Sequence, residues 1–308
     1  MLVNRFLKHK KSQITDTYRM LKLSFKRRFA LLLCLPLLFV ACSQKKQTAS
    51  DFPFQEMERE FPERIPRPIP MEDKGEKENP IVDPEIWDVS NVDISHIDPN
   101  RKLIAFTFDD APSRTLENIL AVFASFNESN PDCPASATVF FNGYLFDATS
   151  EQTVHAAYAL GFELGNHTQS HFDLTTLSKE KLQAEMDATD EILSTVDGKP
   201  RHLLRPPFGS SNDFVKAHAS APIIHWSIDT LDWRKPSEEE IYNSVYTQLT
   251  SGSIVLMHDG YPNTVDALKR LLPDLKAAGY QVVSISALAK AHNCTLKKGG
   301  EYVRLRKQ

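Results

Sequence analysis

Acidic and histidine residues with spacings suited to metal chemistry stand out in this chain of 308 residues. Asp109 and Asp110 are adjacent at the end of the apolar run LIAFTF. Two neighbouring carboxylates repel each other, and burial raises the cost, so a cation is needed to offset it. His167 and His171 are four residues apart, a spacing that places both imidazoles on one side of a helical turn. Two imidazoles and one carboxylate would leave an open coordination position, as in catalytic metal centres.

Chemically competent side chains follow five of the apolar runs. The segments after these runs read DDA, HTQSH, RPPFG, DTLDW and HD, and they add Arg205, Asp229, Asp232 and His258 to the first four residues. Each segment alone is a weak signal, and His167 with His171 would equally fit two surface histidines. Asp229 either helps to hold His258 or caps its own strand end. The coincidence of five segments predicts one site, because parallel strands gather their carboxyl ends at one face.

The elements that position these residues follow from the alternation of apolar runs with amphipathic stretches. Seven runs read as strands: KLIAFTF, ATVFFN, FELGN, HLLR, PIIHWSI, GSIVLMH and QVVSI. Residues 178–196 and 237–249 read as helices, since each begins with serine and carries acidic residues in its first turn. Strand–helix alternation predicts an α/β fold, a barrel-like arrangement of about seven parallel strands.

The five motifs together resemble those of the NodB-homology polysaccharide deacetylases, carbohydrate esterase family four, over residues 101–292. The resemblance implies a distorted (β/α) barrel and metal-dependent removal of acetyl groups from sugar polymers. It further implies Asp109 as general base, oriented by Arg205, and His258 as general acid, paired with Asp232. The implied metal ligands are Asp110, His167 and His171. The remaining implied positions are Phe208, whose backbone N–H helps to hold the oxyanion, Trp233 as a groove wall and Leu256 in the acetate pocket.

This chemistry is consistent with the residue types. Amide hydrolysis needs a charged base and a protonated acid at the same pH, which predicts a bell-shaped rate profile. The donor set suits one divalent metal, with Zn²⁺ expected first and Co²⁺, Ni²⁺ or Mn²⁺ as alternatives. Two positions depart from the family pattern. Ala111 replaces a usual glycine and is expected to narrow the mouth of the site, and Phe208 replaces a common tyrosine.

The N-terminal region reads as a lipoprotein signal peptide over residues 1–41. Residues 1–28 contain nine Lys and Arg, and the uninterrupted apolar run FALLLCLPLLFVA spans 29–41. The tail FVAC resembles a bacterial lipobox, which makes Cys42 the lipidated residue, and translation from Met20 would give a more typical signal. An uncleaved membrane anchor is the alternative. Both readings place the rest of the chain outside the cytoplasmic membrane.

Composition divides the remaining chain into a tether at 42–100, a catalytic domain at 101–292 and a tail at 293–308. Eight of the 19 prolines fall between Pro53 and Pro99, in a stretch too polar to fold alone, although residues 86–97 have enough apolar side chains to dock on the domain. Cys133 and Cys294 either form a disulfide or stay as free thiols. Without residues 1–41 the net charge falls from −4 to −12, because that segment carries nine basic residues and one acidic residue. No basic patch for nucleic acid remains.

The sequence therefore predicts a lipid-anchored monomer that removes N-acetyl groups from N-acetylglucosamine in peptidoglycan or a chitin-like polysaccharide. One alternative is an O-acetyl esterase that acts on xylan or another polysaccharide. The other is a non-catalytic glycan-binding lipoprotein.

Overall fold

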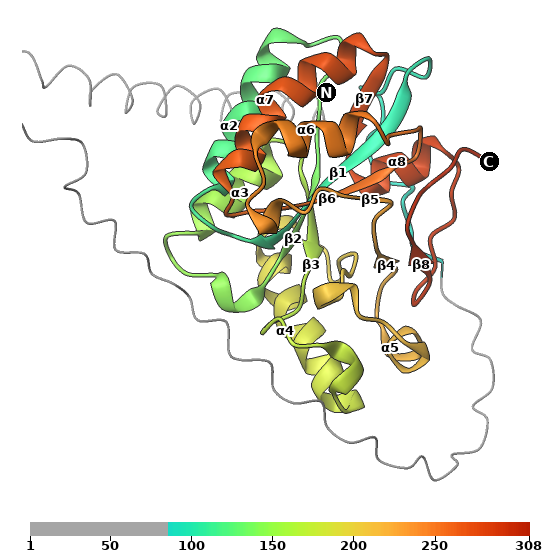
Figure 1. Cartoon of the computed structure of the whole chain (residues 1–308). Helices are drawn as coiled ribbons and strands as arrows, with labels where there is room; N and C mark the ends of the chain where they lie inside the picture. Colours follow the sequence, from blue (N-terminus) through green and yellow to red (C-terminus); the bar gives the residue numbers. More distant parts are fainter. Residues whose placement is uncertain (1–85) are drawn as a thin grey trace, which may run out of the picture. The chain divides into compact units, whose positions relative to one another are not determined.

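The computed structural model describes residues 86–308 (Figure 1). The predicted signal peptide at 1–41, the lipidation site Cys42 and the predicted tether up to residue 85 lie outside the described residues. Within residues 86–308, no helix combines the length and the apolar sequence that crossing a membrane requires.

Strand β1 (Lys102–Ala111) is the centre of a parallel sheet. Its partners are β2 (Thr138–Phe141), β6 (Ile254–His258) and β7 (Tyr280–Val283). Next to β2 lies β3 (Glu163–Asn166), and next to β6 lies β5 (Ile228–Asp229). Helices pack around the sheet (Figure 1), so β1 is buried along almost its whole length, which explains its continuous apolar sequence.

The sheet closes on itself through residues 204 and 223–229. Leu204 forms parallel bridges with Asn166 of β3 and with Ile223 of β4 (Ile223–Ile224). The chain then runs directly into β5, which pairs with β6. The ring from β1 through β2, β3, Leu204, β4 and β5 to β6 and back is the expected distorted (β/α) barrel.

The details of two predicted strands were wrong. HLLR contributes only the bridge at Leu204, because Pro206 and Pro207 follow and lack the N–H groups that would extend the ladder. The run PIIHWSI is split into β4 and β5, since its N–H groups bond first toward Tyr302 and then toward Ile254. An unpredicted strand, β8 (Glu301–Tyr302), pairs with β4.

The two helices expected at 178–196 and 237–249 begin where the sequence places capping serines. Ser178 Oγ accepts from the backbone N–H of Lys181 at the start of α4 (Lys179–Asp197), and Ser237 forms a capping box with Glu240 in α6 (Glu238–Tyr246). The first predicted helix, 178–196, is thereby confirmed, and the second ends three residues earlier than predicted. The seven α-helices of the described residues are α2 (Leu116–Ser129), α3 (Glu151–Ala159), α4 (Lys179–Asp197), α5 (Asp213–His218), α6 (Glu238–Tyr246), α7 (Pro262–Ala277) and α8 (Ile285–Ala291).

Residues on both sides of the predicted catalytic domain contact the barrel. Apolar side chains of residues 86–97 pack against one of the core clusters, and Lys290 Nζ donates to Ser90 O at 2.6 Å and to Val92 O at 2.8 Å. The docked alternative for residues 86–97 is therefore the one that the structure adopts.

Cys133 and Cys294 do not form a disulfide, and both are free thiols.

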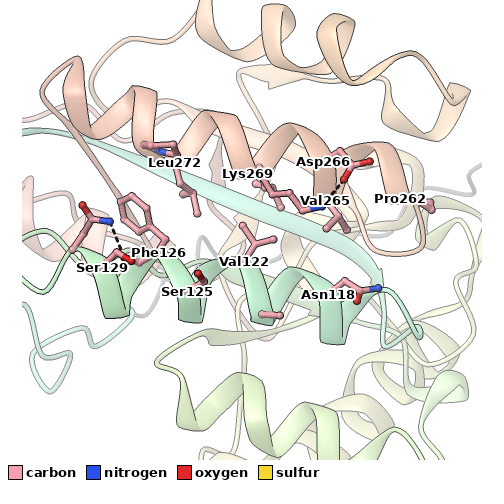
Figure 2. A pocket seen from close by; sticks show the side chains of 14 residues that line it. Asn118, Val122, Ser125, Phe126, Ser129, Pro262, Val265, Asp266, Lys269 and Leu272 are labelled. Carbon is pink, nitrogen blue, oxygen red and sulfur yellow. Dashed lines mark hydrogen bonds and ion pairs between the residues drawn. The ribbon is translucent and has the colours of Figure 1, made fainter. Parts of the chain in front are cut away.

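A surface groove of about 670 Å³ lies between α2 and α7 (Figure 2). Val122 and Phe126 of α2 face Val265 and Leu272 of α7 across it. None of the predicted site residues lines this groove. The candidate site is instead at the carboxyl ends of the strands.

Candidate active site

Asp109 is a buried carboxylate held by a buried arginine. Its side chain lies near the end of β1 with only 4% of its surface exposed, and Arg205 Nη1 donates to Asp109 Oδ1 at 2.8 Å. Arg205 is fully buried, donates to Thr107 Oγ1 at 2.6 Å and stacks its guanidinium on the Phe140 ring at 4.2 Å. Burial by itself raises the pKa of Asp109, but the charge and hydrogen bond of Arg205, together with the charges of His167 and His258, outweigh burial and lower the pKa below its ordinary value. Asp109 is therefore held in its charged form.

Asp110 points to a different set of partners because its backbone is in the left-handed region, with φ of 61°. Its Oδ1 lies 3.3 Å from His171 Nε2 and 3.6 Å from His167 Nε2. Two ligands of a tetrahedral Zn²⁺, each about 2.0–2.2 Å from the ion, are roughly 3.4 Å apart, so these separations match a shared cation. One ligand atom from each of the three residues lies within 4.8 Å of the others.

The protonation states of the two histidines also suit a metal. His167 Nδ1 lies 2.6 Å from Arg205 O. A carbonyl oxygen only accepts, so Nδ1 carries the proton and the lone pair of Nε2 is available to a metal ion beside Asp110. Burial lowers the pKa of His167 and of His171, which favours the neutral form that a metal needs. The three residues therefore fit a divalent cation.

The predicted helical turn between the two histidines was wrong. Residues 167–171 form a loop in which Thr168 has φ of 71° and His171 has φ of 57°. The two imidazole rings still approach each other, with centroids 5.0 Å apart. Backbone hydrogen bonds from two neighbouring segments hold this loop, and these contacts could not be inferred from the spacing of the histidines.

His258 ends β6 directly beside Asp109, its register partner on β1. His258 Nδ1 lies 2.7 Å from Asp232 Oδ1, and Asp232 Oδ2 accepts from the His258 backbone N–H at 2.7 Å and from Thr264 Oγ1 at 2.8 Å. Burial lowers the pKa of His258, but the hydrogen bond and charge of Asp232, together with the charges of Asp109 and Asp110, outweigh burial and raise the pKa to about 9. His258 is therefore protonated at neutral pH. The role of Thr264 was missed, since a threonine near the start of a helix carries no specific signal.

The remaining predicted residues surround this group. Phe208, in the short helix η3 (Pro207–Gly209), is 69% exposed, has φ of 60° and places its ring edge-on to His171 at 4.8 Å. Trp233, in η4 (Asp232–Arg234), is 45% exposed, and Arg234 lies over its ring at 4.6 Å. Leu256 is buried within β6, two residues before His258.

Two expectations about neighbouring residues are settled by the structure. Ala111 does not narrow the mouth, because its methyl group is fully buried in the core, and the left-handed residue of this turn is Asp110. Asp229 accepts from the backbone N–H of Leu231 at 2.8 Å, so it caps its strand end.

Asp259 directly follows His258 and is a further neighbour of the site. It is buried, accepts from Ser113 N at 2.5 Å and Ser113 Oγ at 2.8 Å, and its N–H donates to Asp109 O. Burial raises the pKa of Asp259 to about 6. It links the loop after β1 to the end of β6.

Comparisons with known proteins agree with this arrangement. The sequence profile of the polysaccharide deacetylases matches residues 96–222. A peptidoglycan-N-acetylglucosamine deacetylase of Bacillus cereus is 33% identical over 213 residues, which are 66% of this chain and 92% of that protein. The peptidoglycan-N-acetylmuramic acid deacetylase PdaC of Bacillus subtilis is 31% identical over 192 residues, and the match covers 62% of this chain but only 40% of PdaC.

The solved structure of PdaC supports the same relationship. It superposes with a TM-score of 0.59 at 31% identity, and the match covers 64% of this chain and 94% of the solved chain. The barrel, the site at its strand ends and a relative matched over nearly its whole length lead to one conclusion. The chain belongs to the polysaccharide deacetylase family.

Proposed function

We propose that this chain is a metal-dependent hydrolase that removes N-acetyl groups from N-acetylglucosamine units of peptidoglycan or a chitin-like polysaccharide. The observation that carries the proposal is that a charged carboxylate at the end of β1 lies beside a protonated imidazole at the end of β6. Asp109 is held charged by Arg205, while its register partner His258 is held protonated by Asp232. Amide hydrolysis needs this combination of a base and an acid on either side of the reacting carbon.

Asp109 acts as the general base in this proposal, and His258 acts as the general acid. Asp109 Oδ2 lies 3.8 Å from His167 Nε2, so a water molecule beside the three ligands is within reach of the carboxylate. Asp109 takes the proton from this water as the water attacks the acetyl carbon. His258 then gives its Nε2 proton to the leaving nitrogen, while Asp232 holds Nδ1. The Phe208 backbone N–H is proposed to donate to the developing oxyanion.

Asp110, His167 and His171 would hold the divalent cation. When bound, the cation polarises the acetyl carbonyl and lowers the pKa of water. Two imidazoles and one carboxylate suit Zn²⁺, which we propose as the bound ion, with Co²⁺, Ni²⁺ and Mn²⁺ as competitors. Leu256 would line the acetate pocket, and Trp233 would form a wall of the glycan groove.

The test is acetate release from purified peptidoglycan, from chitin oligomers and from acetylated xylan by the Zn²⁺-loaded chain. Release from the first two, with loss in Asp109→Asn and His258→Ala, supports the proposal. If His258→Ala retains activity on xylan but loses it on the amides, the leaving group accounts for the difference, because an alcohol leaves with less protonation than an amine. Release from xylan alone would favour the esterase, and release from none would favour a glycan-binding protein.

The proposal places the catalytic domain outside the cytoplasmic membrane, anchored by a lipid on Cys42 and acting as a monomer. Support comes from the basic and apolar composition of residues 1–41 and from the cell-wall substrates named for the relatives. Labelling with a fatty-acid analogue of cells that express the wild-type chain or Cys42→Ser tests the anchor. Equal fatty-acid label on both proteins would exclude lipidation at this position.

A further inference from the structure

The loop at 167–171 that carries both predicted histidine ligands has its backbone held from two sides. On one side lie Asn142 and the short helix η1 (Gly143–Leu145). Asn142 Nδ2 donates to His167 O at 2.6 Å, and the backbone N–H groups of Gly143 and Tyr144 donate to Thr168 O and Gln169 O. These contacts fix the carbonyl groups of the loop.

The other side of the loop is held by α4. Glu185 O accepts from Gln169 N at 2.9 Å, and Glu185 Oε2 accepts from Ser170 N at 2.6 Å. The Ser170 bond is short and charge-assisted, and it lies one residue before His171. Glu185 thus accepts hydrogen bonds from two consecutive backbone N–H groups of the loop.

A second connection from α4 runs through Asp190. Its Oδ1 accepts from Asn166 Nδ2 at 2.9 Å, and Asn166 Oδ1 accepts from Thr168 N at 2.8 Å. Thr168 Oγ1 in turn accepts from His171 N at 3.1 Å. Asp190 is 2% exposed on the helix, a position where an acidic side chain is costly unless it is paired.

We propose that Glu185 and Asp190 are positioning residues that set the affinity of the metal site by holding His171 and His167 in ligating geometry. The inference rests on the proposed function through its metal site. Neither carboxylate belongs to the predicted ligand set, and both act through the loop backbone. Groups that hold metal ligands commonly change metal affinity by about 10–100-fold when they are removed.

Glu185→Ala is the main test, because Glu185 is only half-buried and its side chain bonds to the loop alone among the contacts of the described residues. Glu185→Gln is the conservative variant, since its amide oxygen accepts the same hydrogen bond without the charge. Glu191→Ala is the matched control, a glutamate exposed on the same helix. The dissociation constant of Zn²⁺ is measured on the full-length chain by competition with a chromophoric chelator, and unfolding of the metal-free chain is followed in parallel.

The expected result is a Zn²⁺ dissociation constant about 10–100-fold higher in Glu185→Ala, a smaller rise in Glu185→Gln and no change in Glu191→Ala. Excess Zn²⁺ should restore the kcat of Glu185→Ala. A constant within about twofold of wild type, a rise of equal size in the control, or a rise explained by the unfolded fraction would each overturn the proposal. Because Zn²⁺ binding is measured without substrate, a chain that bound Zn²⁺ normally but released no acetate would contradict only the proposed function.

Discussion

Asp109 and Arg205 form a buried ion pair. The pair contributes to the stability of the fold only when both partners are present. Such a pair costs free energy to bury, and the cost is offset by the hydrogen bonds that Arg205 makes to Thr107 and to the backbone of Ile224 and His225. The arginine therefore serves the fold and the reactive carboxylate together.

Arg205→Gln is expected to lower the free energy of unfolding by about 3–5 kcal/mol at pH 7, because it leaves a buried carboxylate without a cation. The double variant with Asp109→Asn should recover much of that loss, since no buried charge remains. Urea unfolding of wild type, both single variants and the double variant measures the coupling. Effects that add to within about 0.5 kcal/mol would contradict the pairing.

The pH dependence of kcat/KM should show widely separated limbs. His258 must be protonated to donate, so the rate should fall as pH rises through its pKa of about 9. The lowered pKa of Asp109 keeps the base charged down to acidic pH, which makes the profile broader than the ordinary values of these groups would give.

Asp232→Asn is the variant that identifies the alkaline limb. It removes the hydrogen-bonded charge that contributes most to raising the pKa of His258 and leaves burial, which lowers the pKa, opposed only by the smaller effects of Asp109 and Asp110. The limb should therefore move to lower pH, as recorded by initial rates of acetate release from pH 5 to 10. A limb that stays near pH 9 in this variant would assign it to another group.

At the residue scale, the sequence predicted which side chains lie close together, but it did not predict the backbone conformation that brings them together. Asp110, His167 and His171 come together as the order of the motifs suggested, because parallel strands deliver their ends to one face. The left-handed backbone at Asp110 and His171 and the burial of Ala111 depend on contacts with distant segments.

Helix α4 carries the buried carboxylate Asp190, which pairs with a buried histidine beyond the end of the helix. His202, after the helix, is 2% exposed and lies between Asp190 Oδ1 at 2.9 Å and Asp197 Oδ1 at 3.2 Å. Burial lowers the pKa of His202, but the two hydrogen-bonded carboxylates outweigh it and raise the pKa above 6.5. The start of this helix was predictable from Ser178, whereas its buried polar face was not, because the partner loop follows a different strand.

His202→Gln should destabilise the chain most at pH 6 and least at pH 9. Because the folded-state pKa is raised, the stabilisation by protonated His202 is fully present below about 6.5 and is lost as pH rises through the raised pKa. Urea unfolding of both proteins at the two pH values measures the difference. An equal difference at both pH values would show that the histidine contributes only by packing.

At the scale of the whole molecule, residues outside the motifs complete the barrel. Residues 86–97 pack Trp87, Val92, Ile94 and Ile97 against the core cluster that contains α8. Gln281 of β7 accepts from Asp98 N at 3.0 Å and donates to His96 O at 3.1 Å. The proline and charge content of residues 42–100 indicated a tether, while the apolar side chains of residues 86–97 left docking open as the alternative, and the sequence alone could not decide between the two.

A chain that begins at residue 98 should be less stable than one that begins at residue 86. Four apolar side chains would lose their contacts, at a cost on the order of 3–6 kcal/mol. Urea unfolding of the two truncated chains gives the difference, and a chain that begins at residue 77 is the control. Equal stability of all three would mean that the docked segment contributes nothing to the fold.

The left-handed residues of the site have a consequence for directed evolution. Thr168, His171 and Phe208 each occupy a backbone region that costs non-glycine residues about 1–3 kcal/mol, and threonine is a particularly poor occupant. A library selected only for heat resistance would accumulate glycine or asparagine at these positions. Such variants would trade turnover for thermal endurance, so selection should score acetate release after heating rather than survival alone.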